Sequence, residues 1–260
     1  MIPACLILRP RALAILATVL IALAPSGKAA AAALRIAVAS NFATTATVIS
    51  QLFERATGHR VILSPGATGR HFAQIVHGAP FDIFLAAGAA RPRKLEKMGR
   101  AVTGTRFTYA LGRLVLWSPR PGYVDKEGKI LSSAPFAHLA MANPRLAPYG
   151  LAARQALKSF GVFGRLRPRA VYGQNIAQTF SLVATGNAEL GLVALSYAAS
   201  PGYRQRGSRW EIPPGAYDPI RQDAILLTRC KDNGAATAFL AYLRSPAAQK
   251  LIVSSGYGVQ

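Results

Sequence analysis

The sequence predicts an α/β fold of two lobes, each a mostly parallel sheet flanked by helices, joined by two crossover strands. Strand-like and helix-like segments alternate from residue 34 to the C-terminus. Such alternation places helices on both faces of a parallel sheet. The apolar run 107–118 (FTYALGRLVLWS) is also too long for a strand of one small sheet. We therefore expect this segment to leave one sheet and enter a second.

The first lobe begins with three strand–helix pairs. Short runs rich in Val, Ile, Leu and Phe predict strands at 34–39, 60–64 and 81–86. Helices are expected after them at 43–57, 70–77 and 91–97. The first helix has apolar residues at helical spacing, and Gly58 and Gly99 stand where helix-ending glycines belong.

The second lobe follows the long strand. It is expected to contain strands at 138–142, 170–172 and 189–195 and helices at 150–160 and 177–185. Segment 200–217 is rich in Pro, Gly and Arg and predicts an irregular connection. A strand at 222–227 and one or two helices within 235–254 return the chain to the first lobe. The predicted boundaries are 34–116 and 206–260 for the first lobe and 117–205 for the second.

The N-terminus has the pattern of a secretory signal peptide over residues 1–33. Arg9 and Arg11 precede an apolar run at 12–24, and a tract of small residues ends at Ala33. The apolar run is shorter than the roughly 20 residues that span a bilayer. Cys5 precedes this run, so it cannot be the lipid-carrying cysteine that follows a cleavage site. We expect an exported, periplasmic protein.

The remaining composition favours a soluble protein that attracts anions. Lys and Arg number 31 against 10 Asp and Glu in the full chain, a formal net charge of +21, and removal of Arg9, Arg11 and Lys28 with the signal peptide leaves +18. A field of this sign concentrates anions of any kind. A nucleic-acid or membrane-surface binder is an alternative, but the basic residues form no dense tract and the protein is exported. Cys230 alone remains after cleavage, so no internal disulfide is expected.

Residues suited to catalysis form no constellation in the sequence. His71 and His77 are six residues apart on one short helix, and His59 and His138 lie far from both. None of them has metal-ligand spacing with a carboxylate or with Cys230. No GxSxG element surrounds a serine. The sequence predicts a protein that is not an enzyme and has no cofactor; the alternative is a periplasmic hydrolase or transferase that uses Ser40.

Four strand-to-helix junctions have short polar or glycine residues at the start of the helix. They are Ser40-Asn41, 66–69 (GATG), 148–150 (PYG) and 174–176 (QNI). A helix N-terminus presents free N–H groups and a partial positive charge, which suit an oxyanion. In open parallel sheets these junctions lie at the ligand-binding edge. One junction alone is usually a simple helix cap; four, two in each half, predict an oxyanion site.

These junctions lie in segments that resemble the periplasmic molybdate-binding proteins of ATP-binding-cassette importers. The matching segments are AVASNF (37–42), GATGRHFAQIVHGAPFDIFLAA (66–87), ANPRLAPYGLAARQAL (142–157), AELGLVALS (188–196) and FLAYLRSPAAQKLIVSSGYGV (239–259). The likeness covers residues 34–260. It implies a monomer that closes on molybdate or tungstate between its lobes and delivers the anion to a membrane permease.

The resemblance also implies which residues bind the anion. Ser40 and Thr68 match hydroxyl ligands, and Asn41 matches an asparagine found in one subgroup. Tyr149 and Ile176 match positions that contribute backbone N–H groups. The metal itself would be reached only through the molybdate oxygens, by Ser40, Thr68, Tyr149 and Ile176.

Three positions depart from the family pattern. Ala194 stands where another subgroup has an oxygen-binding tyrosine, and Asn41 is expected to replace that donor. Ala67 stands where a second serine is common, which would weaken the cage or change its selectivity. Ala87-Gly88 replaces a frequent Ala-Asp outside the contacts.

The expected donors agree with the chemistry of the anion. Molybdate is a tetrahedral dianion that offers only acceptors, so a cage of neutral donors fits it and disfavours protonated phosphate. The same fold binding sulfate, thiosulfate or phosphate remains the nearest alternative, because the sequence does not give the dimensions of the cage.

Overall fold

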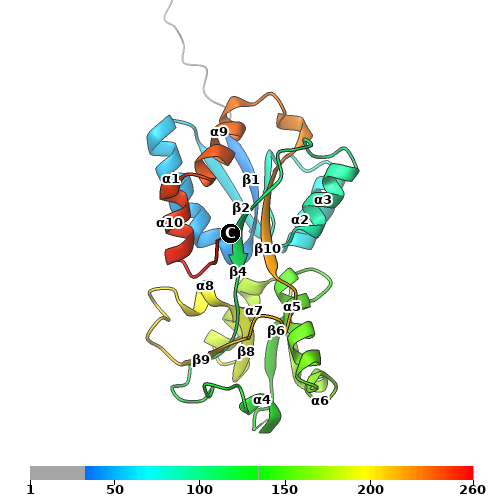
Figure 1. The fold of residues 1–260 in the computed structure, drawn as a ribbon, viewed down its shortest axis with the longest axis vertical. Helices are drawn as coiled ribbons and strands as arrows, with labels where there is room; N and C mark the ends of the chain where they lie inside the picture. The colour runs from blue at the N-terminus through cyan, green and yellow to red at the C-terminus, as the bar shows by residue number, and fades with distance from the viewer. Residues whose placement is uncertain (1–32, 134, 260) are drawn as a thin grey trace, which may run out of the picture. The chain divides into compact units, whose positions relative to one another are not determined.

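The computed structural model describes residues 33–133 and 135–259, so the predicted signal peptide lies almost entirely outside the described residues. The described chain forms two five-stranded sheets flanked by helices (Figure 1). Their strand orders are β2-β1-β3-β10-β4 and β7-β6-β8-β5-β9. The predicted two-lobed α/β fold is confirmed.

The first sheet contains the strands on both sides of the second lobe in sequence. They are β1 (Leu34–Ala39), β2 (Val61–Gly66), β3 (Ile83–Leu85), β4 (Phe107–Gly112) and β10 (Ile220–Leu226). Strand β1 runs parallel to β2 and β3, whereas β10 runs antiparallel to β3 and β4. The helices of this lobe are α1 (Ala43–Thr57), α2 (Thr68–Val76), α3 (Ala90–Lys97), α9 (Gly234–Leu243) and α10 (Pro246–Ser254).

The second sheet has the same mixed character. Its strands are β5 (Leu114–Ser118), β6 (Leu139–Ala142), β7 (Ala170–Gly173), β8 (Leu190–Ala194) and β9 (Ser208–Glu211). Strand β6 runs parallel to β7 and β8, and β5 runs antiparallel to β8 and β9. The helices are α4 (Ile130–Ser133), α5 (Pro148–Ser159), α6 (Phe163–Leu166), α7 (Ile176–Ala184) and α8 (Leu195–Ala198). Short 3-10 turns are η1 (Ser40–Phe42), η2 (Arg167–Arg169) and η3 (Thr228–Cys230).

The crossings between the sheets differ from the predicted lobe boundaries. The long apolar run does serve two sheets, but it divides at Arg113, whereas the sequence predicts the boundary at 116/117. The return crossing is residues 212–219, not 205/206, because β9 belongs to the second sheet. Strand β9 is not predictable from an apolar run, because its residues SRWE alternate between half-buried and exposed positions. Segment 200–217 is therefore not wholly irregular.

Apolar side chains of the parallel strands form the core of each lobe. In the first lobe Ile36 on β1 is fully buried in one cluster with Ile49 and Phe53 of α1 and Phe239 of α9. Helix α1 ends at Gly58, whose φ of 73° is left-handed, as the sequence predicts. Burial of these faces fixes the register, so that Ala39 and Gly66 end β1 and β2 at one edge. That edge carries the first two polar junctions.

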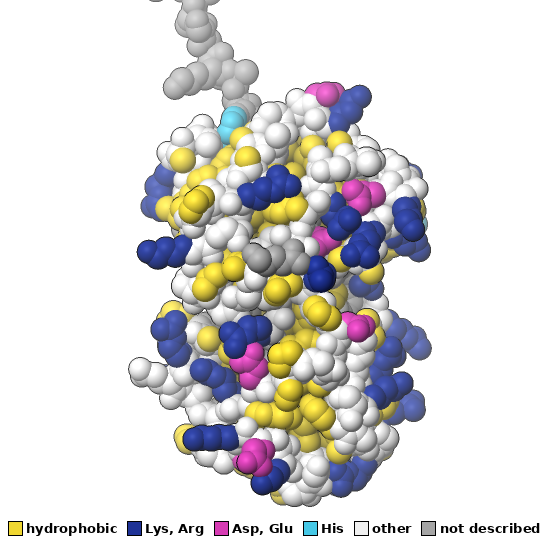
Figure 2. All heavy atoms as spheres, viewed as in Figure 1, with side chains coloured by type: hydrophobic (Ala, Val, Ile, Leu, Met, Phe, Trp, Pro, Cys, Tyr) yellow, Lys and Arg dark blue, Asp and Glu magenta, His cyan; other side chains and the backbone are white. Residues whose placement is uncertain are grey.

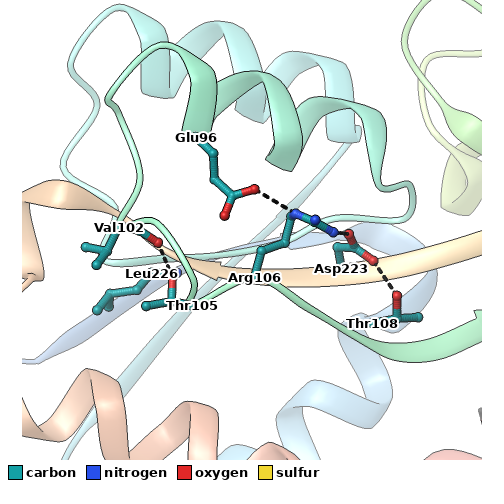
Figure 3. A network of polar contacts seen from close by, with 7 residues as sticks. All are labelled: Glu96, Val102, Thr105, Arg106, Thr108, Asp223 and Leu226. Carbon is teal, nitrogen blue, oxygen red and sulfur yellow. Dashed lines mark hydrogen bonds and ion pairs between the residues drawn. The ribbon is translucent and has the colours of Figure 1, made fainter.

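A network of ion pairs and hydrogen bonds around the buried Asp223 connects α3 to the strands β4 and β10 (Figure 3). Asp223 is fully buried and accepts hydrogen bonds from Arg106 Nη1 and Thr108 Oγ1, each at 2.8 Å. Arg106 Nε also donates to Glu96 Oε2 at 2.7 Å. A buried carboxylate requires such partners, because burial removes its hydration. The network fixes the strand that also carries Gln222.

Two expectations about the chain as a whole can be compared with the structure. None of the helices in the described portion is long and apolar enough to cross a membrane. Cys230 is buried and free, and its Sγ lies 2.8 Å from Asp82 Oδ1. Burial and the neighbouring carboxylate raise the pKa of the Cys230 thiol to about 11, so the thiol is protonated at neutral pH.

Candidate functional site

The four polar junctions converge on one small cavity between the two sheets. Its volume is about 10 Å³, about the space of one water molecule, so the walls lie closer together than a bound oxyanion requires. The lining comes from η1, the N-termini of α2, α5 and α7, and the strand ends before them. It includes all five residues predicted for the site: Ser40, Asn41, Thr68, Tyr149 and Ile176. Ala39, Gly66, Ala67, Ala87, Ala147, Pro148 and Asn175 complete it.

Two hydroxyl groups in the wall of the cavity each have a proton free to donate in a hydrogen bond. Thr68 Oγ1 accepts the N–H of Ala87 at 3.1 Å, and Ser40 Oγ accepts the N–H of Ala177 at 3.4 Å. A hydroxyl has one proton to donate in addition to its lone pairs. Because each oxygen already accepts from a backbone N–H, each proton is available to an acceptor in the cavity.

Helix N-termini provide the backbone donors. Helix α5 begins with Pro148, which has no N–H, so Tyr149 carries the first N–H of that helix. Ile176 is the first residue of α7, so its N–H has no acceptor within the helix. The side chain of Asn175 caps α7 by accepting from Gln178 N, and this leaves the Ile176 N–H for another acceptor. Both N–H groups carry the positive end of a helix dipole.

Asn41 lines the cavity, but its amide N–H groups point elsewhere in the structure. Nδ2 donates to Gln222 Oε1 at 2.9 Å and to Tyr257 Oη at 3.3 Å. Tyr257 in turn donates to the Asn41 carbonyl at 2.6 Å. The expectation that Asn41 presents a donor to the anion therefore requires a different orientation of the amide.

The cavity wall contains no charged side chain among its twelve lining residues. Burial raises the pKa of Tyr149 well above its ordinary value, and likewise that of Tyr257 beside it. Burial lowers the pKa of His71, which lies behind the wall with its Nδ1 3.1 Å from Gln74 Oε1. All three are uncharged at neutral pH, so the site is a neutral set of donors. Lys and Arg instead spread over the visible surface (Figure 2).

His71 also explains why residue 66 is glycine. A Cβ on Gly66 would lie 2.7 Å from His71 Nε2, closer than real contacts allow. The glycine thus lets the 66–68 loop approach the imidazole, which supports the loop from behind. His71 has a structural position, as expected, and His77 and His138 are exposed. In the described part of the chain no three His, Cys, Asp or Glu residues are grouped to hold a metal ion.

Residues from the second lobe hold the turn η1, which carries Ser40 and Asn41. Tyr197 Oη donates to the Ser40 carbonyl at 2.6 Å, and Ser196 Oγ donates to the Asn41 carbonyl at 3.2 Å. Both come from α8, directly after Ala194. A third bond, from Gly69 N to the Leu146 carbonyl at 2.8 Å, also connects elements of the two sheets. Sequence reasoning did not identify Tyr197, Ser196, Gln222 or Tyr257.

Comparison with known proteins gives one matching family and several similar chains. The model of the bacterial extracellular solute-binding proteins matches residues 34–258. The molybdate-binding protein ModA of Azotobacter vinelandii is 51% identical over 89% of this chain and 92% of its own. The ModA of Rhodobacter capsulatus is 43% identical over 88% and 89%. The solved periplasmic molybdate-binding protein of Azotobacter vinelandii superposes with a TM-score of 0.85 at 38% identity, covering 87% of this chain and 99% of its own.

Proposed function

Because the chain belongs to the bacterial extracellular solute-binding proteins, and its relatives place it with the molybdate-binding proteins, we propose that it captures molybdate in the interlobe cavity. It would deliver the anion to the membrane permease of an ATP-binding-cassette importer. Tungstate has the same charge and shape and is expected to bind as well. The binding step needs no bond making or breaking, and we propose that the protein is not an enzyme.

The proposal rests on one observation: the wall of the cavity has hydrogen-bond donors of several kinds and no charged side chain. Hydroxyls of Ser40 and Thr68 and N–H groups of Tyr149 and Ile176 surround it. A fully ionised tetrahedral oxyanion has only acceptors, so every one of these groups can be used. A protonated phosphate would bring an O–H that needs an acceptor, and the wall has no carboxylate to supply one.

Location and assembly follow from the same proposal. The predicted signal peptide and the extracellular solute-binding family both support a periplasmic protein. We propose a monomer, because the site is completed by two lobes of one chain. Closure would be a hinge motion at Arg113 and residues 212–219, where the chain crosses between the sheets.

Isothermal titration of the protein without its leader tests the proposal. One-to-one binding of molybdate is expected, and sulfate is titrated in parallel because it has the same charge and shape. Ser40→Ala and Thr68→Ala should each raise the Kd about tenfold to a hundredfold, since each removes a hydrogen bond to a charged group. Thr47→Ala is the matched control, because its exposed hydroxyl bonds only to the carbonyl of Ala43 within α1. Binding of sulfate or phosphate but not molybdate would keep the fold and reject the ligand.

A further inference from the structure

A buried pair of side-chain amides adjoins the cavity and is only half satisfied. Asn41 Nδ2 donates to Gln222 Oε1 at 2.9 Å, and Gln222 is fully buried on β10. Asn41 Oδ1 and Gln222 Nε2 are both buried and have no hydrogen-bond partner among the described residues. Buried polar groups are seldom left without partners, so this arrangement requires an explanation.

The two amides can bond to each other in only two ways. Either Asn41 donates and Gln222 accepts, as in the structure, or both amides turn by half a rotation and Gln222 donates to Asn41. Turning one alone would bring two N–H groups or two carbonyl oxygens together. The orientation of Gln222 therefore decides which atom of Asn41 is left over.

A bound oxyanion distinguishes the two arrangements. In the first, the free atom of Asn41 is Oδ1, an acceptor, which an anion with only acceptors repels. In the second, the free group is the N–H of Asn41, from which the anion accepts a hydrogen bond. Tyr257 then turns its O–H from the Asn41 carbonyl, which keeps Ser196 as a donor, to Asn41 Oδ1. Gln222 Nε2 would then take the place of Gln222 Oε1, which lies 3.2 Å from Tyr109 Oη. In that place Nε2 can donate to Asn41 Oδ1 and to Tyr109 Oη. Tyr109 can in turn donate to the carbonyl of Ala86 at 3.5 Å.

We propose that Gln222 is a positioning residue for the anion site: it turns together with Asn41 and holds the Asn41 amide with its N–H toward the oxyanion. Gln222 is not among the residues that line the cavity. It acts through Asn41, from a strand 181 residues away in sequence. This inference rests on the proposed function, since it takes a molybdate-like anion as the ligand.

A double-mutant cycle on molybdate affinity tests this coupling. Gln222→Met keeps the length of the side chain but cannot donate to Asn41, and it should raise the Kd about tenfold, the effect of one weakened charge-assisted hydrogen bond. Asn41→Ala should raise the Kd by at least as much. In the Asn41→Ala background, Gln222→Met should have no further effect, because the residue through which Gln222 acts is gone.

Thr108→Val is the matched control for loss of a buried polar contact to β10. Thr108 bonds to Asp223, the neighbour of Gln222, and Asn41 is not its hydrogen-bond partner. It should lower the melting temperature without changing the Kd. Additive effects of the Asn41 and Gln222 substitutions, or an unchanged Kd for Gln222→Met, would overturn the inference. Failure of the wild-type protein to bind molybdate would instead reject the proposed function, and this inference with it.

Nuclear magnetic resonance of the wild-type protein provides a second test that does not depend on the stability of a variant. The side-chain NH₂ signals of Asn41 and Gln222 can be assigned in ¹⁵N-labelled protein by their loss in the two variants. Saturation with molybdate should move both pairs of signals, although Gln222 does not touch the anion. Movement of the Asn41 pair with the Gln222 pair unchanged would show that Gln222 keeps its orientation and would overturn the inference.

Discussion

Removal of the Tyr197 hydroxyl should speed the release of the anion. Tyr197 belongs to α8 of the second lobe, and it donates to the carbonyl of Ser40 in the first lobe at 2.6 Å. Its ring stacks on Phe180 with centroids 5.0 Å apart, so Tyr197→Phe keeps the packing and removes only the hydrogen bond. The Ser40 carbonyl retains a second partner, the N–H of Ala43. Because the carbonyl is not orphaned, the expected loss is that of one ordinary hydrogen bond, about 1 kcal/mol.

This loss corresponds to an increase of about fivefold in Kd. The bond joins the two lobes, so it stabilises the closed form and its loss should appear mainly in the dissociation rate. Stopped-flow displacement of molybdate from the two proteins measures that rate. Tyr172→Phe serves as the control, because Tyr172 is a partly exposed tyrosine of β7 outside the cavity. An unchanged dissociation rate in Tyr197→Phe, or an equal change in the control, would refute the assignment of this bond to closure.

Three further predictions concern buried ionisable groups. Asp223→Ala removes the carboxylate that pairs with Arg106 and Thr108 and should lower the free energy of unfolding by about 1.5–3 kcal/mol in urea titrations, because Arg106 is partly exposed and keeps its bond to Glu96; a loss below about 1 kcal/mol would mean that the pair is solvated. Burial lowers the pKa of His71 below 6.5, so the unfolded state binds a proton first and stability should fall as the pH drops below 6.5. This loss of stability at low pH should be smaller in His71→Gln, as measured by the melting temperature against pH. An identical pH profile in the two proteins would contradict the prediction. The Cys230 thiol, with its pKa raised to about 11, should resist a thiol reagent at pH 8 until urea unfolds the protein, and immediate labelling would show that it is accessible.

The candidate donors could be predicted from the sequence because they are local features. Each of Ser40, Thr68, Tyr149 and Ile176 stands where a strand ends and a helix begins, and such junctions are visible as a change of hydrophobic period. Parallel strands then bring the junctions to one sheet edge, as the pairing of Ala39 with Gly66 shows. Convergence therefore follows from topology once the strands are placed.

The supporting contacts were not predictable in the same way. Tyr197 meets Ser40 across 157 residues, and Tyr257 meets Asn41 across 216. No period or spacing connects such pairs, because they depend on how the two sheets face each other. The division of the long strand at Arg113 was missed for a related reason. The run stays apolar on both sides of this residue, and only the pairing partners change, from β10 to β8 and β9.

The structure separates the charge that attracts the anion from the groups that would hold it. On the face of the described chain seen in Figure 2, Lys and Arg side chains lie on the surface, whereas the twelve residues of the cavity wall include none. A surface field raises the association rate for every anion alike, so it cannot select one of them. Selection must then come from the neutral donors, whose positions are fixed by helix ends, by the α8 contacts and by the buried amide of Gln222. Each hydroxyl or amide donor has a neighbour that occupies its remaining hydrogen-bonding positions. Selectivity should therefore depend as strongly on these supporting residues as on the groups that touch the anion.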